Sequence, residues 1–153
     1  MQKLWVLSGR IAYWLSWPLL FLYLQRSERT RVLVVCGDEV LVVRGWLGNG
    51  RWCLPGGGIH RNELPKDGAV RELMEETGIE ANATDLQFIF SRKSTQKHGP
   101  GFKMHIYALT LANKPKLLKQ KLEITHILWM KKRDLLDSPQ VEDDAKDIVT
   151  AMR

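Results

Sequence analysis

GGIHRNELPKDGAVRELMEETGI, residues 57–79, is the most informative segment of this 153-residue chain. Pro65 to Thr77 is predicted to form a helix, because proline suits the first helical turn and Gly78 can adopt the left-handed conformation that ends a helix. The turn before the helix, Pro55 to Gly58, contains three glycines. Its backbone can approach a ligand closely because it lacks side chains.

Three glutamates, Glu72, Glu75 and Glu76, share about 100° of one face of the predicted helix. Like charges at these spacings cost ~0.2–0.5 kcal/mol per pair in an isolated helix, and Arg71 can neutralise only part of the charge. A solvated acidic face is one interpretation. The other is a site for a hard cation such as Mg²⁺ or Mn²⁺, which prefers oxygen ligands and would cancel the repulsion. The adjacent glycine turn favours this second interpretation, because phosphate chemistry uses carboxylate-bound metals close to the substrate.

The segment resembles the Nudix box, G-x5-E-x7-R-E-U-x-E-E-x-G-U, in which U is an aliphatic residue. All nine specified positions match, and they are Gly57, Glu63, Arg71, Glu72, Leu73, Glu75, Glu76, Gly78 and Ile79. The resemblance extends over residues 31 to 152. It implies an α+β fold, the Nudix α/β/α sandwich with a mixed sheet.

The same resemblance implies a hydrolase that cleaves a phosphoanhydride bond in a nucleoside diphosphate linked to a further group. The expected catalytic residues are Glu63, Arg71, Glu72, Glu75 and Glu76. The last three would hold Mg²⁺ or Mn²⁺, with the Gly57 carbonyl as a further ligand, whereas the first two would form an ion pair that fixes the turn against the helix. The general base stays open between these glutamates and a loop residue outside the box.

Short strands and turns make up most of the remaining chain. Strands are predicted at residues 32–36, 40–44, 86–90, 102–111 and 123–130, and the first two form a hairpin. Apolar residues at helical spacing from Val141 to Met152 predict a closing amphipathic helix, with Ser138 as its N-cap. Asn62 stands where the family commonly has glycine, and asparagine also tolerates the left-handed conformation.

Substrate contacts are expected from cationic and aromatic residues outside the box. The expected contacts are Arg44, Arg51, Arg92, Lys93 and Phe90, with a nucleotide-type small molecule as the partner. A Nudix-fold sensor that binds a nucleotide without turnover is an alternative. Removal of pyrophosphate from RNA 5′ ends is another. A basic connection contains Lys114, Lys116, Lys119 and Lys121. It is interpreted as a solvated loop, with a contact to RNA or anionic lipid as the alternative.

Composition limits the remaining classes of function. Hydrophobic residues make up 44% and charged residues 26% of the chain, which excludes wholesale disorder. The two cysteines provide neither a disulfide framework nor zinc spacing, as is typical of a reducing compartment. The net charge of +6 is concentrated before residue 32, so it does not argue for nucleic-acid binding by the later part of the chain.

Residues 4–24 form an apolar run whose single charge is Arg10. As a helix it would measure ~31 Å, which is enough to cross a bilayer. Basic residues follow the run, and this bias places the later domain in the cytoplasm, tethered to the inner face of the membrane. Packing of the run on the domain, or on a second subunit of a homodimer, is the alternative. The predicted organisation is residues 1–28 as a candidate membrane anchor and 29–153 as a Nudix hydrolase domain.

Overall fold

A mixed sheet forms the centre of the fold in the computed structural model, which describes residues 27–46, 49–94, 101–118 and 123–152. Its strands are β1 (Glu28–Cys36), β2 (Glu39–Gly45), β3 (Gln87–Lys93), β4 (Lys103–Thr110) and β5 (Ile124–Lys131). They lie in the order β3-β4-β1-β2-β5. Strands β1 and β4 are parallel, and the other neighbouring pairs are antiparallel.

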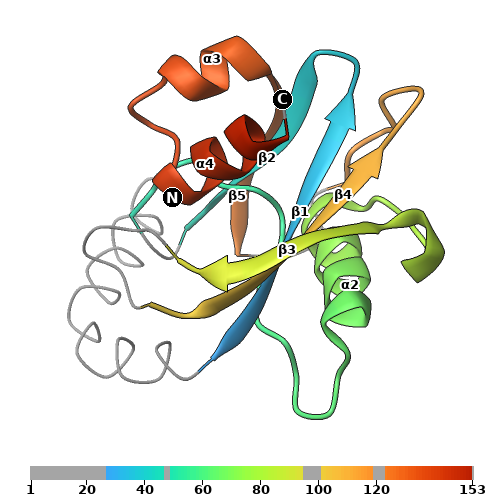
Figure 1. Ribbon diagram of the computed structural model, residues 1–153. Helices are drawn as coiled ribbons and strands as arrows, with labels where there is room; N and C mark the ends of the chain where they lie inside the picture. Colours follow the sequence, from blue (N-terminus) through green and yellow to red (C-terminus); the bar gives the residue numbers. More distant parts are fainter. Residues whose placement is uncertain (1–26, 47–48, 95–100, 119–122, 153) are drawn as a thin grey trace.

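Helices cover both faces of this sheet. They are α2 (Pro65–Thr77), α3 (Lys132–Asp137) and α4 (Asp143–Ala151), with a short 3-10 turn, η1 (Ala83–Asp85), after α2. Helix α2 lies on one side of the strands, whereas α3 and α4 lie on the other (Figure 1). The predicted α/β/α sandwich with a mixed sheet is therefore confirmed for the described residues.

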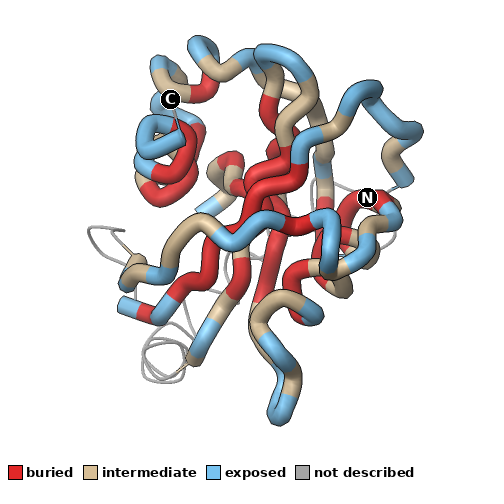
Figure 2. Tube along the Cα trace, turned by 45° about the vertical axis from the view of Figure 1, so that its right-hand side comes forward, coloured by how far each residue is buried: buried red, intermediate tan, exposed pale blue. Residues whose placement is uncertain are grey.

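Alternation along β1 separates the two apolar layers. Val32 and Val34 belong to the cluster that includes Leu73 of α2, whereas Leu33 belongs to the cluster that includes Ile148 of α4. Successive side chains of a strand point to opposite faces, so β1 contributes to both layers. Buried residues accordingly concentrate in the central strands, and exposed ones lie towards the rim (Figure 2).

The glycine turn occupies a place inside the sheet, where β1 and β2 separate. These two strands pair with each other only beside their hairpin, at Val35–Val40 and Cys36–Glu39. Farther along β1, the N–H groups of Val32 and Thr30 donate to the carbonyls of Pro55 and Gly57, each at 2.9 Å. On the other side, Cys53 forms a bridge with Val43 of β2. The opening between two diverging strands thus fixes the turn that leads into α2.

Helix α3 was not expected from the sequence, and it changes the role of Ser138. This serine is the C-cap of α3 and not the N-cap of the last helix, so the predicted cap is wrong. Pro139 follows it, and the residue before a proline is pushed out of the helical region. Leu135 of α3 is fully buried and anchors the helix on the sheet.

The last helix also begins later than predicted, at Asp143. The backbone of Trp52 explains the difference, because it engages the preceding residues in an extended conformation. Its N–H donates to the Gln140 carbonyl at 2.7 Å, and its carbonyl accepts from the Glu142 N–H at 2.9 Å. Val141 is therefore buried in a bridge with Trp52 instead of occupying a helical turn.

The N-terminal expectations lie outside the described residues, since the structure describes nothing before residue 27. Within the described ranges, no helix combines the length and apolar character needed to cross a bilayer. The apolar run 4–24 and the division at residue 28 stay predictions.

Gly56→Ala tests how tightly the turn is held. Gly56 has φ +137°, and a Cβ there would lie 2.2 Å from the Thr30 carbonyl oxygen. Because that neighbour is backbone, it cannot move aside cheaply. We expect a loss of about 2 kcal/mol or more in the free energy of unfolding, measured by urea denaturation.

Gly58→Ala is the matched control, because a Cβ at Gly58 meets nothing within 4 Å. It should change the free energy of unfolding by no more than about 0.5 kcal/mol. Equal effects of the two substitutions would show that the turn is not constrained as described.

Candidate active site

Helix α2 places two of its three glutamates in the interior. Glu72 is 5% exposed and Glu76 is 8% exposed, whereas Glu75 is half-buried. The helix ends as predicted at Gly78, which has φ 74°. Carboxylates are rarely this buried without a partner, so their surroundings decide what the site can do.

The glycine turn lies directly against these two carboxylates. The N–H of Gly56 donates to Glu76 Oε2 at 2.8 Å. A Cβ on Gly57 would come within 2.5 Å of Glu72 Oε1, so only glycine fits beside that carboxylate. The Gly57 carbonyl accepts the Thr30 N–H, and its second lone pair is not used by that bond. The sequence-predicted residues Gly57, Glu72 and Glu76 are therefore brought together.

Arg71 forms the ion pair with Glu63 that the family resemblance implies. Its Nε and Nη2 donate to Glu63 Oε1 and Oε2 at 2.7 and 2.9 Å, and Nη2 also donates to the Gly58 carbonyl at 2.9 Å. Its Nη1 donates to Glu72 Oε1 at 2.8 Å and to Glu75 Oε2 at 3.3 Å. One guanidinium thus ties the turn to the helix and neutralises part of the acidic face.

The geometry before α2 leaves room for this ion pair. Asn62 takes the left-handed conformation, with φ 64°, as the sequence predicts. Glu63 Oε2 also accepts the His60 N–H at 2.8 Å. A Cβ on Gly68 would lie 3.0 Å from the same oxygen, which explains a glycine inside the helix. Hydrogen bonding from Arg71 lowers the pKa of Glu63 to about 2.

The carboxylate and carbonyl oxygens of this site are the type of ligand that a hard divalent cation prefers. Two buried carboxylates and a backbone carbonyl converge on one turn, and glycine provides the space beside Glu72. Among the described residues, however, no three His, Cys, Asp or Glu side chains already form a metal-binding group. Glu75 points to Arg71 instead, so an ion would have to compete with that arginine for Glu72 and Glu75.

Arg29 and Arg31 of β1 are charged residues near the site, and the sequence alone indicated them only as part of the basic flank of the apolar run. Both are half-buried, and Arg31 Nη1 donates to the Gly56 carbonyl at 2.5 Å. Arg29 interacts electrostatically with Glu72 and Glu76. Their spacing of two residues within one strand is the signal that could have placed them on one face of the sheet.

Glu142, just before α4, is a further half-buried charge on this side of the sheet. Burial raises the pKa of Glu142, and Arg31 partly offsets that effect. Arg31 also interacts with Asp144, which is 4% exposed. Nothing in the local sequence indicated these contacts, because they join β1 to the last helix.

The arginines predicted to contact substrate are paired with residues 139–147. Arg44 donates to Gln140 Oε1 at 2.9 Å and lies over the Trp52 ring, and Arg51 donates to the Pro139 carbonyl at 3.0 Å. Arg92 contacts Asp144 and Asp147 at 3.4 and 3.3 Å. Their role toward substrate stays a prediction.

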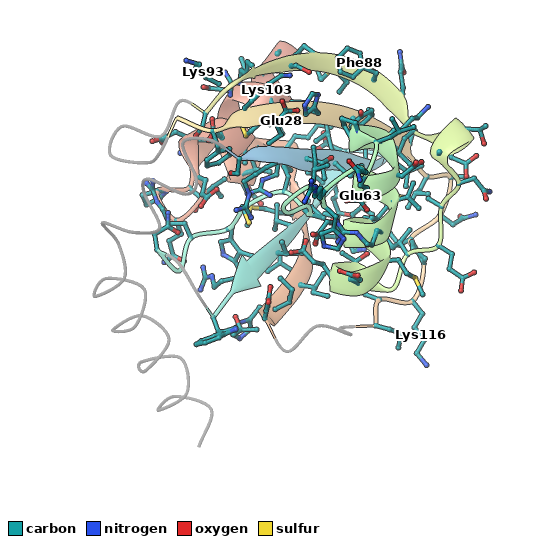
Figure 3. The ribbon with its side chains drawn as sticks, turned by 90° about the horizontal axis from the view of Figure 1, so that it is seen from below. Glu28, Glu63, Phe88, Lys93, Lys103 and Lys116 are labelled. Carbon is teal, nitrogen blue, oxygen red and sulfur yellow. The ribbon has the colours of Figure 1, made fainter. Side chains whose placement is uncertain are left out.

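The other predicted substrate contacts lie away from Glu63. Phe90 packs against the apolar cluster on the α4 side. Lys93 is at the end of β3 distant from Phe88, whereas Glu63 lies beside α2 (Figure 3). Lys116, from the connection considered for RNA, projects on yet another side of the molecule (Figure 3).

Residues 26–151 match the family described as NUDIX domain. The chain belongs to the Nudix family. Human diphosphoinositol polyphosphate phosphohydrolase 3-beta is 36% identical over 86 residues, which are 56% of this chain and 46% of that protein. The chain thus spans about half the length of the curated relatives it matches.

Solved structures confirm the Nudix fold. The bifunctional NMN adenylyltransferase/ADP ribose pyrophosphatase from Francisella tularensis, complexed with AMP and a Mn ion, has a TM-score of 0.70 at 17% identity, covering 94% of this chain and 46% of that one. The NUDIX domain of Shewanella oneidensis NrtR, complexed with ADP ribose, has a TM-score of 0.67 at 20% identity. The match covers 82% of this chain and 86% of that one. At these identities, the likeness shows the fold of the chain.

Glu63→Gln tests the ion pair that organises the Nudix turn. The folded pKa of Glu63 is about 2, below its value of 4.5 in an unfolded chain, so the carboxylate stabilises the fold above about pH 4.5. That stability is lost as the pH falls toward 2. At pH 7 the substitution should lower the free energy of unfolding by about 2 kcal/mol.

Urea denaturation between pH 7 and pH 3.5 measures this effect. We expect the difference between wild type and Glu63→Gln to shrink below about pH 5, because the unfolded wild-type chain binds the proton first. Glu80→Gln, at an exposed position beyond α2, is the control and should have little effect at pH 7. A difference that stays constant down to pH 3.5 would argue against the described pair.

Proposed function

We propose that this chain is a metal-dependent hydrolase that cleaves a phosphoanhydride bond in a nucleoside diphosphate linked to a further group. The observation that carries the proposal is the burial of Glu72 and Glu76 against a turn built from glycine. Burying two carboxylates on adjacent helical turns is unfavourable unless a cation or donors compensate them. Membership in the Nudix family supports the same proposal of a hydrolase.

The metal site of this proposal consists of Glu72, Glu75, Glu76 and the Gly57 carbonyl. Mg²⁺ is the expected ion, with Mn²⁺ as the alternative, because all the donors are oxygen atoms. When bound, such an ion supplies positive charge to the pyrophosphate and lowers the pKa of water.

In the proposed reaction, a water oxygen forms a bond to one phosphorus and the bond from that phosphorus to the bridging oxygen breaks. The water proton passes to a carboxylate, and two phosphate-bearing products leave. Arg71 and Glu63 keep the turn at a fixed distance from Glu72 throughout, because their hydrogen bonds reach both the helix and the Gly58 carbonyl. The proposed substrate contacts are Arg44, Arg51, Arg92, Lys93 and Phe90, whose ring centroid lies 5.8 Å from the Arg92 guanidinium.

A diphosphate group on an inositol polyphosphate is the second candidate substrate. The curated relatives named diphosphoinositol polyphosphate phosphohydrolases favour it, although they match only about half of their length to this chain. Turnover of a nucleotide panel, a diphosphoinositol polyphosphate and 5′-triphosphorylated RNA, each with Mg²⁺, distinguishes these substrates. Tight nucleotide binding without any turnover would instead favour the sensor function.

Glu76→Gln tests the hydrolase proposal directly. The glutamine oxygen can still accept the Gly56 N–H, so the fold should persist, but the negative charge is lost. We expect kcat to fall roughly a hundredfold or more. Phosphate release from the best substrate is the measurement, and EDTA should abolish it in the wild type until Mg²⁺ or Mn²⁺ is restored.

The control for this test is Glu80→Gln, which removes the same charge at an exposed position. It should keep wild-type turnover, and circular dichroism should show that both variants are folded. Equal activity of wild type and Glu76→Gln would refute the assignment.

We also propose that residues 1–28 tether the catalytic domain, 29–153, to the inner face of a membrane. The support is the apolar run 4–24 followed by basic residues. Interfacial binding and full insertion are both consistent with its length and aromatic content.

Membrane fractionation tests the tether. Cells expressing the full chain are compared with cells expressing a chain that starts at Glu28. We expect the full chain in the membrane fraction and the shortened chain in the soluble one, because only the first carries the apolar run. An equal distribution of the two would count against a membrane role.

A further inference from the structure

Five arginines lie on the side of the sheet that faces α4, and four of them have an oxygen partner. These partners are the Gly56 carbonyl for Arg31, Gln140 for Arg44, the Pro139 carbonyl for Arg51, and Asp144 with Asp147 for Arg92. Arg29 is the exception. Within the described part of the chain, its guanidinium makes no hydrogen bond or ion pair, and its buried Nε has no acceptor.

The position of Arg29 is fixed by its strand and by an aromatic ring. Its backbone forms a bridge with Gly58, the last residue of the turn that touches Glu72 and Glu76. Its guanidinium lies 5.5 Å from the centroid of the Phe102 ring. A cation–π contact leaves the N–H groups of a guanidinium able to donate to a charged group with several oxygens.

The electrostatic surroundings of Arg29 disfavour its positive charge, so this charge does not stabilise the fold by itself. Burial lowers the pKa of Arg29, and the like charge of Arg31 lowers it further, more than Glu72 and Glu76 compensate. A charged side chain with a buried N–H group that has no acceptor destabilises a protein. An anionic ligand between the two arginines would accept the unpaired N–H of Arg29 and would offset the repulsion between the two positive charges.

We infer that Arg29 binds a phosphate oxygen of the substrate, beside the glycine turn and the carboxylates of α2. The inference rests on the proposed hydrolase function and adds to it a phosphate-binding residue on β1. Phosphate fits because it has several anionic oxygens and accepts two parallel hydrogen bonds from a guanidinium. Arg31, already bound to the turn, supplies a second positive charge beside it.

Binding of inorganic pyrophosphate to the full chain in the presence of Mg²⁺ tests this role. Isothermal titration calorimetry compares wild type, Arg29→Met and Arg29→Lys. Methionine keeps an apolar stem on Phe102, so Arg29→Met should fold and have a melting temperature no lower than wild type. Its Kd for pyrophosphate should rise about ten- to a hundredfold, because charged hydrogen bonds are lost.

Arg133→Met is the matched control, because it removes the same charge from an exposed position on α3. It should bind pyrophosphate as tightly as wild type. Equal affinities of Arg29→Met and Arg133→Met would overturn the inference, as would a wild-type chain that binds no pyrophosphate. If Arg29→Met does not fold, Arg29→Lys decides: about fivefold weaker binding supports the inference, and wild-type affinity overturns it.

Turnover measured on the same variants separates this inference from the proposed function. A wild type that hydrolyses substrate, with unchanged KM and pyrophosphate affinity in Arg29→Met, overturns only the role of Arg29. A wild type that hydrolyses nothing, yet loses pyrophosphate affinity on this substitution, overturns the hydrolase proposal and supports the phosphate contact.

Discussion

The guanidinium of Arg71 holds the glycine turn and the helix α2 in one arrangement. It reaches Glu63, Glu72 and the Gly58 carbonyl at distances between 2.7 and 2.9 Å. Without it, a row of glutamates at adjacent helical positions would repel one another, and the turn would lose its attachment to the helix. Because the planar group has five donors in a fixed geometry, a lysine could not make the same set of bonds.

The glycine turn can contact residues on both faces of the sheet because β1 and β2 separate. The turn fills the opening, so its backbone meets α2 carboxylates on one side and the Arg31 guanidinium on the other. Gly56 shows both contacts: its N–H donates to Glu76 and its carbonyl accepts from Arg31. A reacting phosphate near this residue therefore lies within reach of groups from both helical layers, although those layers are separated elsewhere by buried strands.

Local sequence patterns correctly predicted those features of the fold that depend only on residues close together in the sequence. The bounds of α2, the left-handed Asn62 and the hairpin all follow from turn chemistry and spacing within a few positions. Two failures came from contacts between distant segments. Trp52 draws Val141 into an extended bridge and delays α4, and the diverging strands turn Arg29 from a flanking charge into a residue beside the site. Both contacts join residues that are far apart in the sequence, so no local pattern predicts them.

The pairing of arginines with residues 139–147 limits how a polyanionic substrate can bind. Arg92 meets Asp147 at 3.3 Å, and that carboxylate is 47% exposed, so the pair is weak and easily exchanged for a phosphate. Arg31 donates to the buried Gly56 carbonyl at 2.5 Å and would keep that bond when a substrate binds. Under the proposed function, affinity for a longer phosphate chain would depend on replacing the exposed carboxylates of Asp147 and Asp143, which pair with Arg92 and Arg51. Contact with the first phosphate would instead depend on arginines of β1 that the fold already holds in place. The more phosphates a substrate carries, the more of these exposed pairs it can displace, and the steeper its dependence on salt becomes.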